Sequence, residues 1–105
     1  MKALSPASVS VLKAIAAGQR HGFDIMDLTG LPSGTVYPIL GRLEKNGVVR
    51  ARWESTAAAH REKRPPRRYY EITGAGSKVL ARSIEYYRAL TRALPAGGIP
   101  RPSHG

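Results

Sequence analysis

Hydroxyl-bearing, small and basic residues gather in one short segment whose chemistry suits the phosphates of a nucleic acid. The segment follows a Thr-Gly-Leu-Pro break at residues 29–32, where a helix is expected to begin. Hydroxyls, free backbone N–H groups and the positive end of a helix all favour phosphate oxygens. The candidate contacts share the polar side of this segment: Ser33, Gly34, Thr35, Tyr37, Arg42 and Lys45.

A second basic segment lies between two predicted strands. Residues 60–68 carry five cations against the single carboxylate of Glu62, a net charge of +4. Arginine can form paired hydrogen bonds with phosphates or enter a narrow minor groove. The candidate phosphate contacts here are Arg61, Lys63, Arg64, Arg67 and Arg68. A solvated basic loop without a ligand is the alternative.

The composition favours a polyanionic partner. The chain has 105 residues, with 17 Lys and Arg against 7 Asp and Glu, and a formal net charge of +10. This length suits one domain, and this charge favours nucleic acid first and an anionic membrane surface second. The chain has no cysteine, which excludes disulfides, thiol catalysis and every cysteine-based metal site.

The remaining polar residues form no pattern of a catalytic or metal site. His21, His60 and His104 are far apart and lack metal-ligand spacing, and Asp24 and Asp27 share a helical face without a third ligand. The sequence also lacks a glycine fingerprint for nucleotides. We therefore expect no enzyme activity, no metal and no cofactor.

The elements that must position these residues can be predicted from periodicity and capping signals. We expect helices at residues 6–17, 22–28, 33–46 and 74–94, strands at 48–54 and 67–72, and a loop at 55–66. Ser5 and Thr73 are the expected N-caps of the first and last helices. Phe23, Met26 and Leu28 are expected to supply the buried contacts of the second helix.

This order predicts a mostly helical fold with a small β-hairpin: a winged helix-turn-helix followed by a C-terminal dimerisation helix. The third helix would enter a major groove, and the hairpin would be the wing. We expect residues 1–73 to be the DNA-binding domain, residues 74–94 the dimerisation helix and residues 95–105 a disordered tail.

The final helix has a wide apolar face that must be covered. Two rows at alternating spacings of four and three supply the candidate dimer contacts: Val79, Leu80, Ser83, Ile84, Tyr86, Tyr87, Leu90, Thr91 and Leu94. One part of this face would cover the core and the rest would pair with a second subunit. Packing on its own domain alone is the alternative. Trp53, Tyr86 and Tyr87, together with Met26, could line a ligand cavity, although they could equally be ordinary core and interface residues.

The chain resembles the PadR-type transcriptional regulators, in the subgroup with a short C-terminal helix. The matching segments are residues 21–25 (HGFDI), 29–40 (TGLPSGTVYPIL), 42–49 (RLEKNGVV), 68–73 (RYYEIT) and Gly76, and the resemblance spans residues 4–94. It implies a homodimeric bacterial repressor that binds double-stranded DNA at an inverted-repeat operator. It also implies that Tyr37 contacts DNA, and it is compatible with release of the repressor by a small aromatic or hydrophobic inducer or by another signal.

Two other binding functions remain open at this stage. A basic RNA-binding or ribosome-associated protein would bind structured RNA with comparable affinity, although an aromatic-rich stacking sheet is missing. A protein-interaction module would dimerise without salt-dependent affinity for DNA. The sequence shows neither a transmembrane stretch nor a secretory signal, so we expect a cytoplasmic protein, nucleoid-associated when bound to DNA, without a membrane partner.

Overall fold

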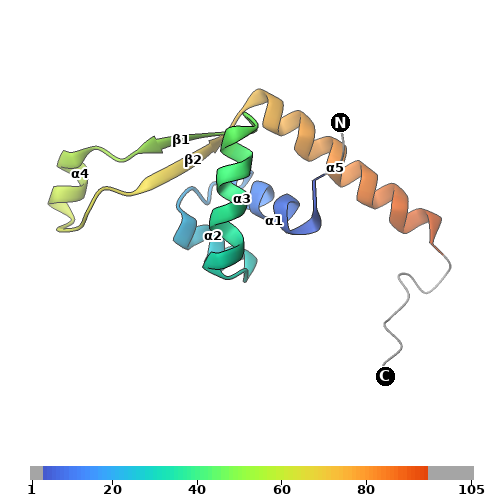
Figure 1. Ribbon diagram of the computed structural model, residues 1–105, viewed down its shortest axis with the longest axis horizontal. Coiled ribbons are helices and arrows are strands. Elements are labelled where there is room, and N and C mark those ends of the chain that lie inside the picture. The colour runs from blue at the N-terminus through green and yellow to red at the C-terminus, as the bar shows by residue number, and fades with distance from the viewer. Residues whose placement is uncertain (1–3, 95–105) are drawn as a thin grey trace, which may run out of the picture.

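The computed structural model describes residues 4–94, which form a winged helix with a long C-terminal helix (Figure 1). The elements in chain order are α1 (Pro6–Ala16), α2 (Gly22–Thr29), α3 (Ser33–Lys45), β1 (Val49–Trp53), α4 (Thr56–Arg61), β2 (Arg68–Ile72) and α5 (Gly74–Ala93). The first three helices form the body, and β1 and β2 form an antiparallel hairpin. The predicted fold class is confirmed, and the tail expected at residues 95–105 lies outside the described residues.

The capping signals in the sequence place the helix ends. The Ser5 side chain accepts a hydrogen bond from the backbone N–H of Ser8 at 3.2 Å, and Pro6 occupies the first turn of α1. The Thr73 hydroxyl oxygen accepts from the N–H of Gly76 at 3.0 Å and donates to the carbonyl of Gly47 at 2.7 Å. Each cap satisfies a backbone group that the helix leaves unpaired. Both predicted N-caps are confirmed.

The core forms where α1 meets the other elements of the body. α1 contacts α2, α3, β2 and α5, and its side chains Val11 and Leu12 are fully buried. α2 contributes Ile25, and α3 contributes a row at helical spacing: Val36, Ile39, Leu40 and Leu43. Burying one stripe of α3 leaves its opposite side free to face a partner.

The expected contacts of α2 are partly wrong. Phe23 is 74% exposed and Leu28 is 59% exposed, whereas Ile25 is fully buried. Met26 is half-buried against the core. Because α2 has only eight residues, it presents a narrow face to the body, and Ile25 occupies the centre of that face.

The wing differs from the predicted simple loop because a short helix closes its tip. The strands pair in the register Val49↔Ile72 to Trp53↔Arg68. Beyond this pairing, the Ser55 side chain accepts from the N–H of Ala58 at 3.1 Å and begins α4. A Ser cap followed by an alanine run is a helix signal, but six residues are too few to show a helical period.

The molecule is elongated, with principal extents of 55 × 34 × 20 Å. Its radius of gyration is 16.5 Å, against ~13 Å for a compact domain of about 100 residues. Figure 1 shows the reason, since the wing and α5 leave the body in opposite directions. Among residues 4–94, no helix combines the length and the apolar character that crossing a bilayer requires.

Candidate nucleic-acid interface

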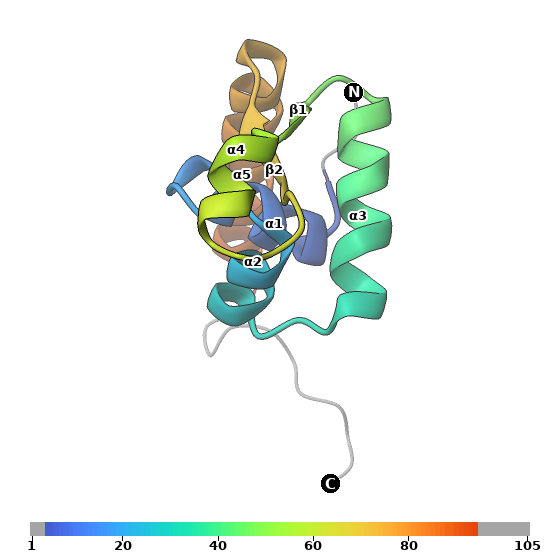
Figure 2. The ribbon, with the colours of Figure 1, turned by 90° about the vertical axis from the view of Figure 1, so that its left-hand side faces the viewer.

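α3 presents a polar face next to the wing. Figure 2 shows α3 standing at one side of the molecule with the hairpin beside it. Of the α3 residues predicted to contact DNA, Thr35 is half-buried. The others are exposed: Ser33, Gly34, Tyr37, Arg42 and Lys45. The first turn therefore offers hydroxyls and N–H groups, and the last turns offer cations, as a recognition helix requires.

Tyr37 is held in place by a glycine at the start of α2. Its side chain is 51% exposed, and its ring lies against Gly22. A Cβ atom at Gly22 would lie 2.5 Å from the Tyr37 hydroxyl oxygen, which is closer than real contacts allow. The missing side chain of Gly22 thus provides the space in which the partly exposed Tyr37 ring lies.

A groove of about 510 Å³ connects this tyrosine to the wing. Its walls come from the start of α2, from α3 and from β2: His21, Gly22, Phe23, Asp24, Tyr37, Arg67, Arg68 and Tyr70. The chain segment before α2 bonds directly to β2, because the N–H of Tyr70 donates to the carbonyl of Arg20 at 2.9 Å. Burial raises the pKa of Tyr70, so its ring stays neutral beneath the two arginines.

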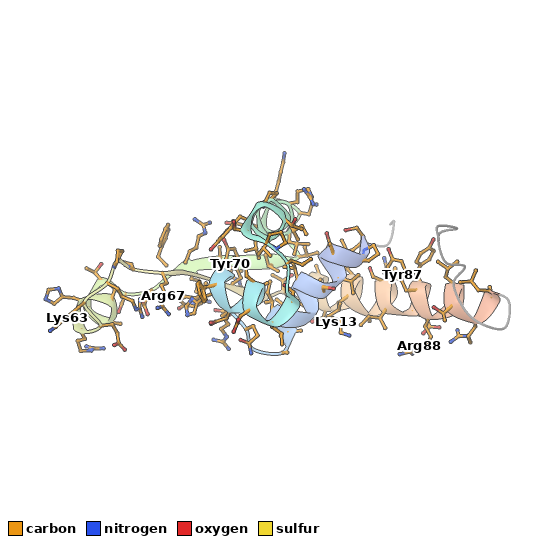
Figure 3. All side chains as sticks on the ribbon, turned by 90° about the horizontal axis from the view of Figure 1, so that it is seen from below. Lys13, Lys63, Arg67, Tyr70, Tyr87 and Arg88 are labelled. Atoms are coloured by element: carbon orange, nitrogen blue, oxygen red, sulfur yellow. The ribbon has the colours of Figure 1, made fainter. Side chains whose placement is uncertain are left out.

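Three of the five predicted wing cations are exposed: Arg61, Lys63 and Arg67. Figure 3 shows Lys63 at the far tip of the wing and Arg67 where β2 is about to begin, close to the body. Lys63 has a positive φ of 56° at the turn that follows α4. Long cationic side chains spread along a projecting hairpin can neutralise several phosphates at once.

Arg64 holds the wing tip together. Its guanidinium donates to both carboxylate oxygens of Glu54, at 2.5 and 2.9 Å, and the backbone N–H of Arg67 donates to the same carboxylate at 3.4 Å. Hydrogen bonding from Arg64 lowers the pKa of Glu54 to about 2. A carboxylate so held stays ionised and ties α4 to the end of β1.

Arg68 also has an acidic partner. Its guanidinium donates to the Glu44 carboxylate at 2.7 Å and lies over the Trp53 ring, 5.5 Å from the ring centroid. Sequence reasoning could not find either arginine's partner, because the partners are 10 and 24 residues away along the chain. Two further cations on the hairpin were not among the predicted contacts: Arg50 is exposed, and Arg52 pairs with Glu71 at 3.0 Å.

The candidate dimer residues on α5 divide into two groups. Val79 and Ser83 are buried in their own chain, where Ser83 accepts a hydrogen bond from the backbone N–H of Leu4 at 3.0 Å. Further along, Tyr86 is 53% exposed and Leu90 is 45% exposed. The remaining candidates differ in exposure. Thr91 is exposed, and four are half-buried: Leu80, Ile84, Tyr87 and Leu94.

The predicted ligand-lining residues do not meet within one chain. Trp53 lies on the wing, whereas Tyr86 and Tyr87 lie on α5, at the other side of the body (Figure 1). Tyr86 and Tyr87 pack edge to face with ring centroids 5.1 Å apart, and the Tyr87 hydroxyl donates to the carbonyl of Leu4 at 2.7 Å. Within residues 4–94 there is no cluster of side chains that could hold a metal ion.

Comparison with known proteins identifies relatives of this architecture. The sequence model of the transcriptional regulator PadR-like family matches residues 11–82. A PadR family transcription regulator from Clostridium difficile R20291 is similar in structure, with a TM-score of 0.73 and 17% identity, over 84% of this chain and 93% of that chain. A PadR-like transcriptional regulator from Bacillus cereus has a TM-score of 0.64 and 20% identity, over 81% of this chain and 84% of that chain.

A third similar structure belongs to a regulator that responds to a small molecule. Bordetella bronchiseptica BpsR, whose DNA binding is regulated by 6-hydroxynicotinic acid, has a TM-score of 0.66 and 16% identity, over 90% of this chain and 70% of that chain. No curated protein sequence matches the chain.

Proposed function

Because the chain belongs to the transcriptional regulator PadR-like family, and is thus a DNA-binding regulator and not an enzyme, we propose that it is a homodimeric repressor of an inverted-repeat operator. It would act in the cytoplasm, on the nucleoid, by occluding a promoter. The observation that carries this proposal is the polar face of α3, with Tyr37 exposed on it and a cationic wing beside it.

The DNA contacts divide between the two elements. The first turn of α3, with Ser33, Gly34, Thr35 and Tyr37, would enter the major groove, and Arg42 and Lys45 would reach the flanking phosphates. The wing would lie along the adjacent backbone, with Arg61, Lys63 and Arg67 on phosphates. Arg64 would contribute by holding α4 in place.

The exposed turns of α5 would supply the dimer contact. Tyr86 and Leu90 are large apolar side chains on the surface of a helix that projects from the body. Such a patch is stabilised when a second copy covers it, and a two-fold axis would then relate two recognition helices. Their half-sites would lie about one helical turn, ~34 Å, apart. Residues 1–73 would thus bind DNA and residues 74–94 would set the spacing.

Release by a small molecule would act through this spacing. The similarity to BpsR, a protein regulated by 6-hydroxynicotinic acid, favours an aromatic ligand. Trp53, Tyr86 and Tyr87 would line its site only if two subunits bring them together. A ligand that binds one subunit arrangement better than the other shifts the population between them.

Selection of bound nucleic acid from random pools tests the proposal. The full chain is incubated with random duplex DNA and, in parallel, with random structured RNA. We expect an inverted-repeat DNA motif to be enriched, with half-sites one helical turn apart. Equal enrichment of RNA, or an asymmetric DNA motif, would contradict the proposal.

A further inference from the structure

The polar face of α3 carries an acidic residue in a position that DNA binding alone does not explain. Glu44 lies in the last turn of α3, between the cations proposed to reach phosphates, and its carboxylate is partly exposed. A carboxylate near a phosphate backbone is repelled by it. Its partner in the structure is Arg68, the first residue of β2, whose guanidinium donates to it at 2.7 Å.

This ion pair lies where the wing leaves the body. Arg68 pairs with Trp53 in the last rung of the hairpin ladder, and only α4 and its connections lie beyond. Two rungs closer to the body, Tyr70 is buried in the core. Among residues 4–94, the bond from Arg68 to Glu44 is the one side-chain hydrogen bond between α3 and the hairpin.

Trp53 completes the arrangement from the opposite strand. The guanidinium carbon of Arg68 lies over the ring, 5.5 Å from its centre, so the cation contacts the indole face while its N–H group reaches the carboxylate. Each group limits the freedom of the next, since the indole orients the guanidinium and the carboxylate holds it.

We propose that Glu44, Arg68 and Trp53 form a strut that fixes the angle between the recognition helix and the wing. Arg68 is then a positioning residue, and the phosphates are left to Arg61, Lys63 and Arg67. The proposal rests on the proposed function for its effect on DNA, but the strut itself exists in the free protein. A partly exposed ion pair adds little to global stability, so its loss should free the wing without unfolding the body.

The direction in which operator affinity changes distinguishes a strut from a purely electrostatic effect of the Glu44 charge. Replacing Glu44 with Gln removes a negative charge, and charge alone would strengthen DNA binding. A strut predicts the opposite: Glu44→Gln and Arg68→Gln should each weaken operator binding by about five-fold. Neither substitution should change the slope of log affinity against log salt, because no phosphate contact is lost.

The single tryptophan of the chain reports on the strut without DNA. Acrylamide quenching of Trp53 fluorescence is measured for the free full chain, for Glu44→Gln, for Arg68→Gln and for the charge swap Glu44→Arg with Arg68→Glu. We expect both single variants to increase quenching and the swap to reverse only part of the increase, because it restores the ion pair but leaves no cation over the indole. Arg52→Gln is the matched control, since Arg52 forms an ion pair with Glu71 on the same hairpin without a bond to α3.

Each outcome decides the proposal. Quenching that is unchanged in the single variants, or increased equally by Arg52→Gln, would overturn the strut. So would tighter operator binding by Glu44→Gln, or a salt slope lowered by about 0.9 in Arg68→Gln, which is the mark of a lost phosphate contact. If the wild-type chain binds no operator, the proposed function fails, and the quenching series still decides whether the strut exists.

Discussion

At the scale of single residues, the site depends on a few close contacts that hold exposed side chains still. Tyr37 faces solvent but lies against Gly22, and Arg64 lies in the wing but is held by Glu54. An exposed side chain that is already fixed loses less conformational entropy on binding. The contacts behind the surface therefore matter as much as the groups that touch DNA.

Gly22→Ala should weaken operator binding by moving Tyr37. The new methyl group would overlap the tyrosine ring, so the ring must shift away from its place against the start of α2. We expect a loss of about ten-fold in operator affinity, measured by fluorescence anisotropy, because a misplaced contact forfeits ~1.4 kcal/mol. Gly74→Ala is the control, since a Cβ there meets nothing within 4 Å. An equal loss in both variants would contradict this role of Gly22.

The wing tip should loosen at low pH through Glu54. Arg64 lowers the pKa of Glu54 from 4.5 to about 2, so the folded tip prefers the ionised carboxylate. The stabilisation of the wing tip by ionised Glu54 is fully present above pH 4.5 and is lost as the pH falls through 2. The protection of the α4 amides, measured against the intrinsic exchange rate at each pH, should therefore fall between pH 4 and pH 2, and Glu54→Gln should lower this protection at every pH. A wild-type tip with the same exchange protection at pH 2 as at pH 5 would contradict the assignment.

At the scale of elements, the sequence predicts best what depends on neighbours along the chain. The N-caps Ser5 and Thr73 and the buried row of α3 follow from spacing alone, and all of them are confirmed. The ion pairs of Arg64 and Arg68 could not be predicted, because they form only once the hairpin has closed and α3 has packed beside it. The short α4 went unpredicted because six residues carry no period.

The wing cations should determine much of the salt dependence of binding. Arg61 is the last residue of α4, and Lys63 lies in the turn that follows it. Both side chains are exposed, so each can neutralise a phosphate. Replacing both with Gln should lower the slope of log affinity against log salt by about 1.8, since each phosphate contact contributes ~0.9. Titrations at several salt concentrations measure this slope. Arg82→Gln on α5 is the control, and an unchanged slope in the double variant would remove the wing tip from the interface.

At the scale of the whole molecule, the elongated shape separates two functions. The wing and the far turns of α5 lie at opposite ends of the molecule, with α3 between them (Figure 1). One copy can therefore bind DNA and a second copy at the same time. Because α1 contacts both α5 and the other helices of the body, a change in the dimer could reach the recognition helix through the core.

Leu90→Glu should prevent the proposed dimer from forming and leave a folded monomer. Leu90 is 45% exposed in the single chain, so a carboxylate there costs little in the monomer but would be buried in the dimer. We expect sedimentation velocity to show a monomer, and operator affinity to fall by at least about a hundred-fold because the second half-site no longer helps. Ala81→Glu, at an exposed position on the opposite side of α5 from Leu90, should remain dimeric. A dimeric Leu90→Glu variant would place the interface elsewhere.

We propose that the polar face of α3 reads base sequence while the wing binds the backbone. The most direct measurement compares Tyr37→Ala and Arg61→Gln on the selected operator and on scrambled DNA of equal length. We expect Tyr37→Ala to lower the affinity for the operator by about a hundred-fold and the affinity for scrambled DNA only slightly, and Arg61→Gln to lower both affinities alike. Equal losses on both DNAs for Tyr37→Ala, with its melting temperature unchanged, would contradict the account.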